Sequence, residues 1–358
     1  MEMKFIRNFL IRICILFLFV IAVVLLFDPF FQYHKPLPGL KAVLADKEYQ
    51  VTGTLRNFDY DSLIVGSSVT ENNNNTWFDE AFDCTTIKAI RSYGATADLC
   101  YLLDEAYETH ELKHVFYNID PSALTADTNT TYELTGCPMY LYDHNYFNDI
   151  EYVLNKSVLF EKIPYLLAQS LMTDYDEGNS YNWAQWKSFN SDMALGLYIR
   201  RPQVADMKEE TCYQEQLDGN ISILTTVIAT HPETDFKIFI PPYSMLWWDN
   251  LYRDGDTESY LYNMEQAVST LLTYDNVEIY YFQNDEAIIT NLENYMDNIH
   301  FSPDINYYIC EEMAAGRHKL TPDNYQTEMN DMRTLAYHIV DDLMEQYVDR
   351  IKVDTAVE

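Results

Sequence analysis

The chain has 358 residues, and its 23 Lys and Arg against 56 Asp and Glu give a formal net charge of −33 at pH 7. Hydrophobic residues make up 48% of the sequence, which excludes a mainly disordered chain and provides for one large domain or two modest ones. The acidity argues against nucleic acid as a partner and against electrostatic attachment to anionic lipid, because both need a basic surface. The 30 Tyr, 18 Phe and 5 Trp either fill cores or stack on sugars.

The first thirty residues predict a membrane anchor. Lys4, Arg7 and Arg12 precede the unbroken apolar run Ile13–Phe27, and Asp28 follows it. The run and the residues just before it are long enough to cross a bilayer, with the basic end in the cytoplasm. A cleaved signal peptide is the alternative, but the following LLFDPFFQYH has no small-residue cleavage site. We therefore expect a single-pass protein of the cell membrane, with an extracytoplasmic domain.

The cysteines give no evidence for a disulfide scaffold or a metal site. Cys14 lies in the apolar run, and an odd number of cysteines is left outside it, with no C-x-x-C pair. Most of these are expected to be buried thiols. The five are Cys84, Cys100, Cys137, Cys212 and Cys310.

Residues 31–58, which include Pro36 and Pro38, are expected to form a linker, and residues 59–358 an α/β domain. Short apolar runs alternate there with amphipathic stretches, which predicts a parallel sheet between two layers of helices. The predicted strands are Ser62–Val65, Thr85–Ile90, Val115–Ile119, Phe236–Ile240 and Val277–Tyr281. The predicted helices between them are Ala95–Thr109, Gln216–Ala229 and Glu258–Leu272.

The alternation breaks over about 121–204, where a mainly helical insertion is expected, with helices near Tyr146–Leu154 and Ser157–Met172. Its aromatic patch, Tyr181-Asn182-Trp183 with Trp186, either borders a substrate cleft or belongs to a layer that touches no ligand. Residues 326–351 repeat apolar side chains at helical spacing, which predicts a closing amphipathic helix.

Two motifs carry candidate chemistry. The strand Ser62–Val65 leads directly into Gly66-Ser67-Ser68, and a serine at the end of a strand can meet the free N–H groups that favour an oxyanion. Gly-Ser turns after strands are also common structural features. Asp297 and His300 lie within one turn of each other, so the carboxylate can orient the imidazole toward a nucleophile. A loop-stabilising Asp–His hydrogen bond is the alternative.

Together, a Gly-x-Ser after the first strand and an Asp-x-x-His before the terminal helices resemble the SGNH/GDSL hydrolase superfamily. The resemblance covers order and spacing over roughly residues 62–316. It implies a flavodoxin-like sheet and selects Ser68, two residues after the glycine, as the nucleophile. The membrane anchor makes the chain most similar to the envelope branch that includes the D-alanyl-transfer protein of teichoic-acid operons.

The resemblance also implies oxyanion donors. Gly94, after the second strand, takes the place of the family's oxyanion glycine, beside the N–H of Ser68. The family's Gly-x-Asn-Asp block has no direct counterpart, because the chain reads Phe116-Tyr117-Asn118-Ile119-Asp120-Pro121 there. Asn118 either supplies the amide donor or is structural, and Asp120 is a candidate for the same space.

The sequence thus predicts a membrane-anchored, extracytoplasmic serine esterase or O-acyltransferase that acts on acyl esters of a cell-envelope polysaccharide or teichoic-acid-like polymer. Ser68 would attack the ester, His300 would move the proton and Asp297 would hold the imidazole. Neither a cofactor nor a metal is required. The alternative is a non-catalytic envelope glycan-binding or assembly protein with a degraded site. The sequence does not distinguish hydrolysis from acyl transfer.

Overall fold

Six strands form the central sheet of the computed structural model, which describes residues 2–120, 122–132 and 135–353. The strand order is β2-β1-β3-β5-β6-β7, and the first five strands are parallel. The side chains of β1 from Ser62 to Val65 are fully buried, as expected for a strand covered on both faces. The strands are β1 Ser62–Gly66, β2 Thr86–Ile90, β3 His114–Asn118, β5 Asp235–Ile240, β6 Val277–Tyr281 and β7 Lys319–Leu320.

The mixed α/β architecture and the five predicted strands are confirmed, with one correction. The two-residue strand β7 pairs antiparallel with β6, so the sheet is mostly rather than wholly parallel. A strand this short carries no periodic signal that could have revealed it. β1 lies between β2 and β3, one position from the edge of the sheet.

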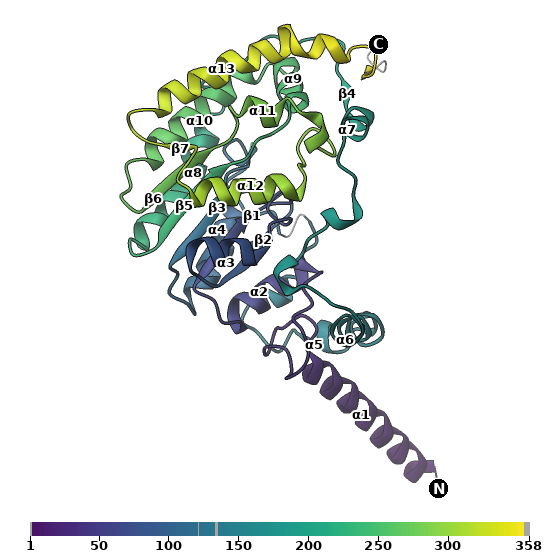
Figure 1. The fold of residues 1–358 in the computed structure, drawn as a ribbon. Coiled ribbons are helices and arrows are strands. Elements are labelled where there is room, and N and C mark those ends of the chain that lie inside the picture. Colours follow the sequence, from purple (N-terminus) through teal and green to yellow (C-terminus); the bar gives the residue numbers. More distant parts are fainter. Residues whose placement is uncertain (1, 121, 133–134, 354–358) are drawn as a thin grey trace. The chain divides into compact units, whose positions relative to one another are not determined.

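Helices flank both faces of the sheet (Figure 1). α3 and α12 pack against each other, and α4, α8 and α10 form a second group. α13 packs on α9 and α10. The bounds of these helices are α3 Asn75–Phe82, α4 Thr96–Tyr107, α8 Gln214–Thr230, α9 Met245–Arg253, α10 Thr257–Leu271, α12 Pro303–Ala314 and α13 Tyr325–Asp341; the short α11 covers Glu286–Ile289.

The closing helix is shorter than the predicted 326–351. α13 ends at Asp341, and the 3₁₀ helix η6, Leu343–Tyr347, and strand β8, Lys352–Val353, follow. Two consecutive acidic residues, Asp341 and Asp342, interact unfavourably with the negative end of the helix dipole, which favours termination of the helix there. β8 pairs with β4, Ile199–Arg200, in a separate two-stranded sheet.

The chain divides into two compact units that do not follow the predicted boundaries. One unit combines Met1–Asp59 with Tyr132–Tyr181, and the other combines Tyr60–Thr131 with Asn182–Glu358. The insertion predicted over 121–204 is therefore shared between them. In the first unit it forms η1 Met139–Leu141, α5 Ile150–Val153, the π-helical turn η2 Val158–Lys162, α6 Ile163–Met172 and η3 Glu177–Asn179; in the second it forms η4 Ala184–Trp186 and α7 Ser191–Leu197.

Residues 31–58, for which the sequence predicts a linker, contain helix α2, Lys47–Asn57, which is largely buried within the first unit. The buried Gln50 side chain donates to the carbonyls of Pro29 and Val43 at 2.9 Å. Gly53 allows the backbone of Phe30 to cross the helix, since a Cβ there would lie 2.5 Å from the Phe30 carbonyl oxygen. Because these contacts are made by polar side chains or by the backbone, no apolar periodicity in the sequence predicts them.

Helix α1, Glu2–Phe27, is long and apolar enough to cross a membrane. It ends at Asp28, which has a positive φ of 36° and precedes Pro29, a residue that cannot continue the hydrogen-bonded ladder. Burial raises the pKa of the Asp28 carboxyl, although hydrogen bonds from Tyr33, Tyr152 and His34 oppose the shift.

All six cysteines are free thiols. Cys100 and Cys310 are buried as expected, and burial raises the pKa of Cys310 to about 12. Cys14 and Cys212 are exposed, and Cys84 and Cys137 are half-buried. Cys14 lies in the apolar helix. Of the five cysteines outside that helix, only two are fully buried.

Candidate active site

The loop after β1 presents one serine and buries the other. Ser67 is only 6% exposed, whereas Ser68 is partly exposed. Gly66 is required here, because a Cβ would clash with the Thr70 side chain and lie 2.8 Å from Cβ of Asn118. The Thr70 N–H donates to the Ser67 carbonyl at 2.9 Å, which closes a tight turn around Ser68.

The loop that carries His300 is held at both ends. Tyr295 and Phe301 form an isolated antiparallel bridge, and the Met296 N–H donates to the His300 carbonyl at 2.9 Å. Within the loop, the backbone N–H groups of Ile299 and His300 donate to Oδ1 of Asp297 at 2.8 and 2.7 Å. The spacing Asp-x-x-His therefore fixes the carboxylate as well as the imidazole.

Ser68, His300 and Asp297 form one hydrogen-bonded line. Oγ of Ser68 lies 2.9 Å from Nε2 of His300, and Nδ1 of His300 lies 2.8 Å from Oδ2 of Asp297. Burial alone would raise the pKa of Asp297, but the hydrogen bonds from His300 and the Ile299 N–H outweigh it and lower that pKa below its usual value. The carboxylate thus stays ionised and favours the Nδ1–H tautomer, which leaves Nε2 to accept the serine proton.

Two further contacts fix the loop that carries Ser68 and were not predicted. Asn306 on α12 is buried, and its side-chain amide donates to the Val69 carbonyl at 2.9 Å and to Oδ1 of Asn73 at 3.1 Å. Because α12 begins three residues after His300, these bonds tie the histidine side of the site to the serine side. A single asparagine within a helix gives no sequence signal for this role.

Trp183 contacts both Ser68 and His300. Its indole N–H donates to the Ser68 carbonyl at 2.9 Å, and its ring packs edge-to-face on His300 with centroids 5.1 Å apart. The neighbouring Ala184 N–H donates to Oδ1 of Asn72 at 3.2 Å. The predicted aromatic patch therefore reaches the site through Trp183, whereas Trp186 is 81% exposed.

The predicted oxyanion donors make hydrogen bonds within the protein. Gly94 follows β2 as expected, but its N–H donates to the Arg91 carbonyl at 3.0 Å. Asn118 is the last residue of β3 and fully buried, and its Nδ2 donates to Oδ1 of Asp120 at 3.0 Å. Within the part of the chain that the structure describes, the Ser68 N–H has no acceptor.

Asp120 is a buried carboxyl at the end of β3. Its Oδ1 also accepts a hydrogen bond from the Tyr243 hydroxyl at 2.6 Å, while its buried Oδ2 has no hydrogen-bond partner among the described residues. Burial raises the pKa of Asp120, although the Ser67, Tyr243 and Asn118 side chains and the nearby His300 partly oppose the shift. Loss of hydration at this depth favours the neutral acid.

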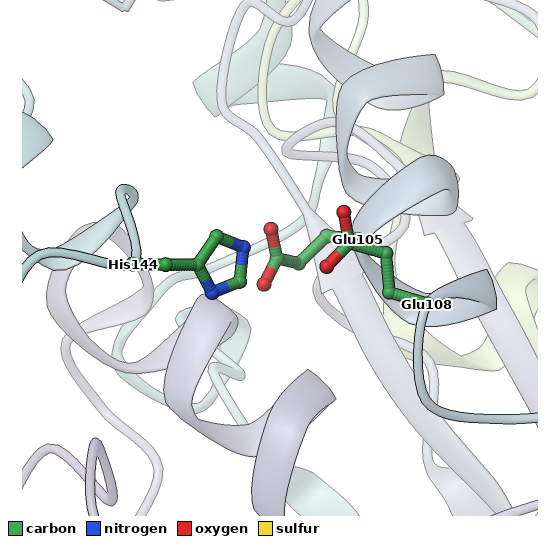
Figure 2. A group of neighbouring side chains, drawn as sticks. All are labelled: Glu105, Glu108 and His144. Atoms are coloured by element: carbon green, nitrogen blue, oxygen red, sulfur yellow. The ribbon is translucent and has the colours of Figure 1, made fainter.

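Two acidic residues lie at the C-terminal end of α4. Figure 2 shows Glu105 in the last turn of that helix, Glu108 directly after it, and His144, which belongs to the other compact unit. We assign no metal site to these three residues.

No family model matches the chain, and no curated protein matches it significantly. The interpretation of the site therefore depends on its geometry and on the motifs that carry the SGNH/GDSL resemblance.

Proposed function

We propose that this chain is a membrane-anchored serine esterase or O-acyltransferase of the SGNH/GDSL type, with Ser68 as its nucleophile. One observation carries the proposal, namely the continuous line of hydrogen bonds from Oγ of Ser68 through His300 to Asp297. The site lies beyond the carboxyl end of a parallel strand, where ligands bind in sheets of this kind. The order of the five parallel strands is also that of flavodoxin-like sheets, which supports the SGNH assignment.

The chemistry follows from the positions of the three side chains. Nε2 of His300 takes the proton as Oγ of Ser68 attacks the acyl carbonyl, and the protonated imidazole then gives it to the leaving alcohol. Asp297 holds the ring and stabilises its charge. The resulting acyl-enzyme is released by water in hydrolysis, or by a polymer hydroxyl in acyl transfer.

The envelope location and substrate class rest on α1 and on the resemblance. With basic residues before the apolar run, α1 would place the α/β domain outside the cytoplasm. The substrate would be an acyl ester of a cell-envelope polysaccharide or teichoic-acid-like polymer. Two exposed aromatic residues that are close in sequence to Gly94 and Trp183, namely Tyr93 at 90% and Trp186 at 81% exposure, offer faces on which sugars can stack.

The second candidate is a non-catalytic envelope glycan-binding or assembly protein. It is favoured by the internal hydrogen bonds of Gly94 and Asn118, which leave the Ser68 N–H as the available backbone donor. Loss of one oxyanion donor typically lowers kcat by about a hundredfold or more. The two candidates therefore differ in whether Ser68 reacts at all.

A fluorophosphonate probe tests the proposal on the full-length protein in detergent. The wild type is expected to be labelled at Ser68, identified by peptide mass spectrometry, and to hydrolyse an activated acetyl ester. Ser68→Ala should abolish labelling and lower ester turnover by about 10⁴-fold or more, since triad members act as a unit. Ser67→Ala is the matched control and should still be labelled. Equal turnover by the wild type and Ser68→Ala would favour the binding protein.

A further inference from the structure

The unit that contains α1 exposes an unusual amount of apolar surface. The exposed fraction is 96% for Phe147, 73% for Phe160 and 83% for Met172. Large apolar side chains that are this exposed mark a contact with a protein or a membrane where they form one patch. We call this set the α5–α6 surface, and its members are Phe147, Ile150, Phe160, Tyr165, Leu171 and Met172.

The α5–α6 surface lies beside the end of the apolar helix. Asp28, directly after α1, accepts a hydrogen bond from the hydroxyl of Tyr152 on α5 at 2.7 Å. The same hydroxyl accepts from the Phe30 N–H at 3.2 Å, and the two rings stack with centroids 5.0 Å apart. α5 and η2 also contact α1 itself. If α1 crosses the bilayer, these bonds place α5 and η2 at the level of its surface.

The orientation and composition of α6 suit that position. In Figure 1, α6 is seen nearly end-on beside the end of α1, so it lies across the direction of α1. Its ten residues, Ile163–Met172, include no charged side chain. Ile163 and Leu166 are buried in the unit, while Tyr165, Leu171 and Met172 are exposed. A helix that is apolar on its outer side as well as its inner side needs an apolar neighbour on both.

We propose that the α5–α6 surface rests in the headgroup and acyl boundary of the membrane that α1 crosses, as a second, interfacial membrane contact. The surface is apolar and aromatic, which is the composition of interfacial helices on their buried side. Its α6 portion carries no charge, so the contact needs no anionic lipid and is compatible with the acidity of the chain. The inference rests on the anchoring role of α1 and is independent of the chemistry of Ser68.

The test uses the full-length protein in phosphatidylcholine vesicles that contain a lipid with a photoreactive diazirine on its acyl chain. After illumination, mass spectrometry should find label in peptides from α1 and from residues 146–172. A peptide from the largely buried helix α2 of the same unit serves as the control and should remain unlabelled. Adding phosphatidylglycerol should leave the pattern unchanged.

A double variant, Leu171→Asp with Met172→Asp, sharpens the result. It should lower labelling of the α6 peptide at least about fivefold and leave labelling of α1 unchanged, because a charged side chain is costly at this depth. Both side chains are largely exposed, so thermal unfolding in detergent should change little; Phe147→Ser provides a second, milder variant. Label in α1 alone, or cross-links from this surface to a second copy of the chain, would overturn the proposal. Label in neither segment would refute the anchoring role of α1 as well, without bearing on the reactivity of Ser68.

Discussion

The two sides of the candidate site are organised differently. On the nucleophile side, Ser68, His300 and Asp297 hydrogen-bond to one another in the order that proton transfer requires. On the oxyanion side, the N–H of Gly94 and the amide of Asn118 are bound to the Arg91 carbonyl and to Asp120. If the proposed function is right, the fold positions the groups that activate the serine, whereas stabilisation of a negative acyl oxygen would depend on fewer donors. The two sides can therefore be tested separately, one through kcat and the other through stability.

The largest expected effect is the loss of kcat in Asp297→Asn, a substitution on the side of the site that carries Ser68 and His300. The amide reverses the hydrogen bond to Nδ1 and favours the wrong imidazole tautomer, so kcat should fall by about 10⁴-fold. Steady-state ester hydrolysis and the rate of fluorophosphonate labelling measure the loss. A change of less than about tenfold would show that His300 does not depend on this carboxylate.

The same variant has a pH signature. Because the folded pKa of Asp297 lies below its usual value of about 3.9, its charge stabilises the folded protein above that pH. The stability is lost as the pH falls through the lowered folded pKa. The difference in Tm between the wild type and Asp297→Asn should therefore be full at neutral pH and shrink in acid. A difference that is constant with pH would assign the loss to packing alone.

Trp183→Phe should have a smaller effect on the same side. Phenylalanine keeps an aromatic ring beside His300 but removes the indole N–H that binds the Ser68 carbonyl. We expect kcat to fall about tenfold with little change in KM, because a small displacement of the nucleophile costs alignment rather than binding. Trp186→Phe is the matched control, and its exposed ring predicts unchanged kcat. Equal effects of the two variants would contradict a positioning role for Trp183.

Asn118→Ala addresses the oxyanion side. Its amide is buried and bound to Asp120, so removal should lower the free energy of unfolding by about 1–3 kcal/mol. The kcat of the folded variant should stay within about threefold of the wild type. Denaturant unfolding and kinetics on the same preparation separate the two effects. A hundredfold loss of kcat at unchanged stability would instead identify Asn118 as an oxyanion donor.

The features that the sequence predicted well share a physical basis. The five parallel strands and helices α4, α8 and α10 follow regular apolar patterns, and Asp297 and His300 are close in sequence. The unit built around α1 and α2 was missed because side chains such as Gln50 hold it through backbone contacts that have no period. Trp183 was visible only as part of an aromatic patch. Asn306 gave no signal, because a buried polar contact between distant segments arises only once the chain is folded.

The smallest expected effect is at Asp120, the buried carboxyl bound to Asn118. Its folded pKa is raised by burial, so the protein loses stability as the pH rises from the usual value of about 3.9 toward the folded pKa. Asp120→Asn has no charge to bury and keeps an oxygen that can accept from Tyr243. Its Tm should therefore match the wild type in acid and exceed it by a few degrees at about pH 8.

Thermal unfolding across this pH range, followed by circular dichroism in one detergent, measures the difference between the two proteins. Ser67→Ala helps to interpret it, because the Ser67 side chain is among the groups that favour the ionised form of Asp120. That variant should lose more stability than the wild type over this pH range, because removal of the Ser67 hydroxyl raises the folded pKa of Asp120 further. If Asp120→Asn instead matched the wild type in acid and became less stable than it as the pH rises, the ionised carboxylate would be the form that the fold prefers. The oxyanion side would then carry a fixed negative charge close to the serine, which would favour the binding protein over the enzyme.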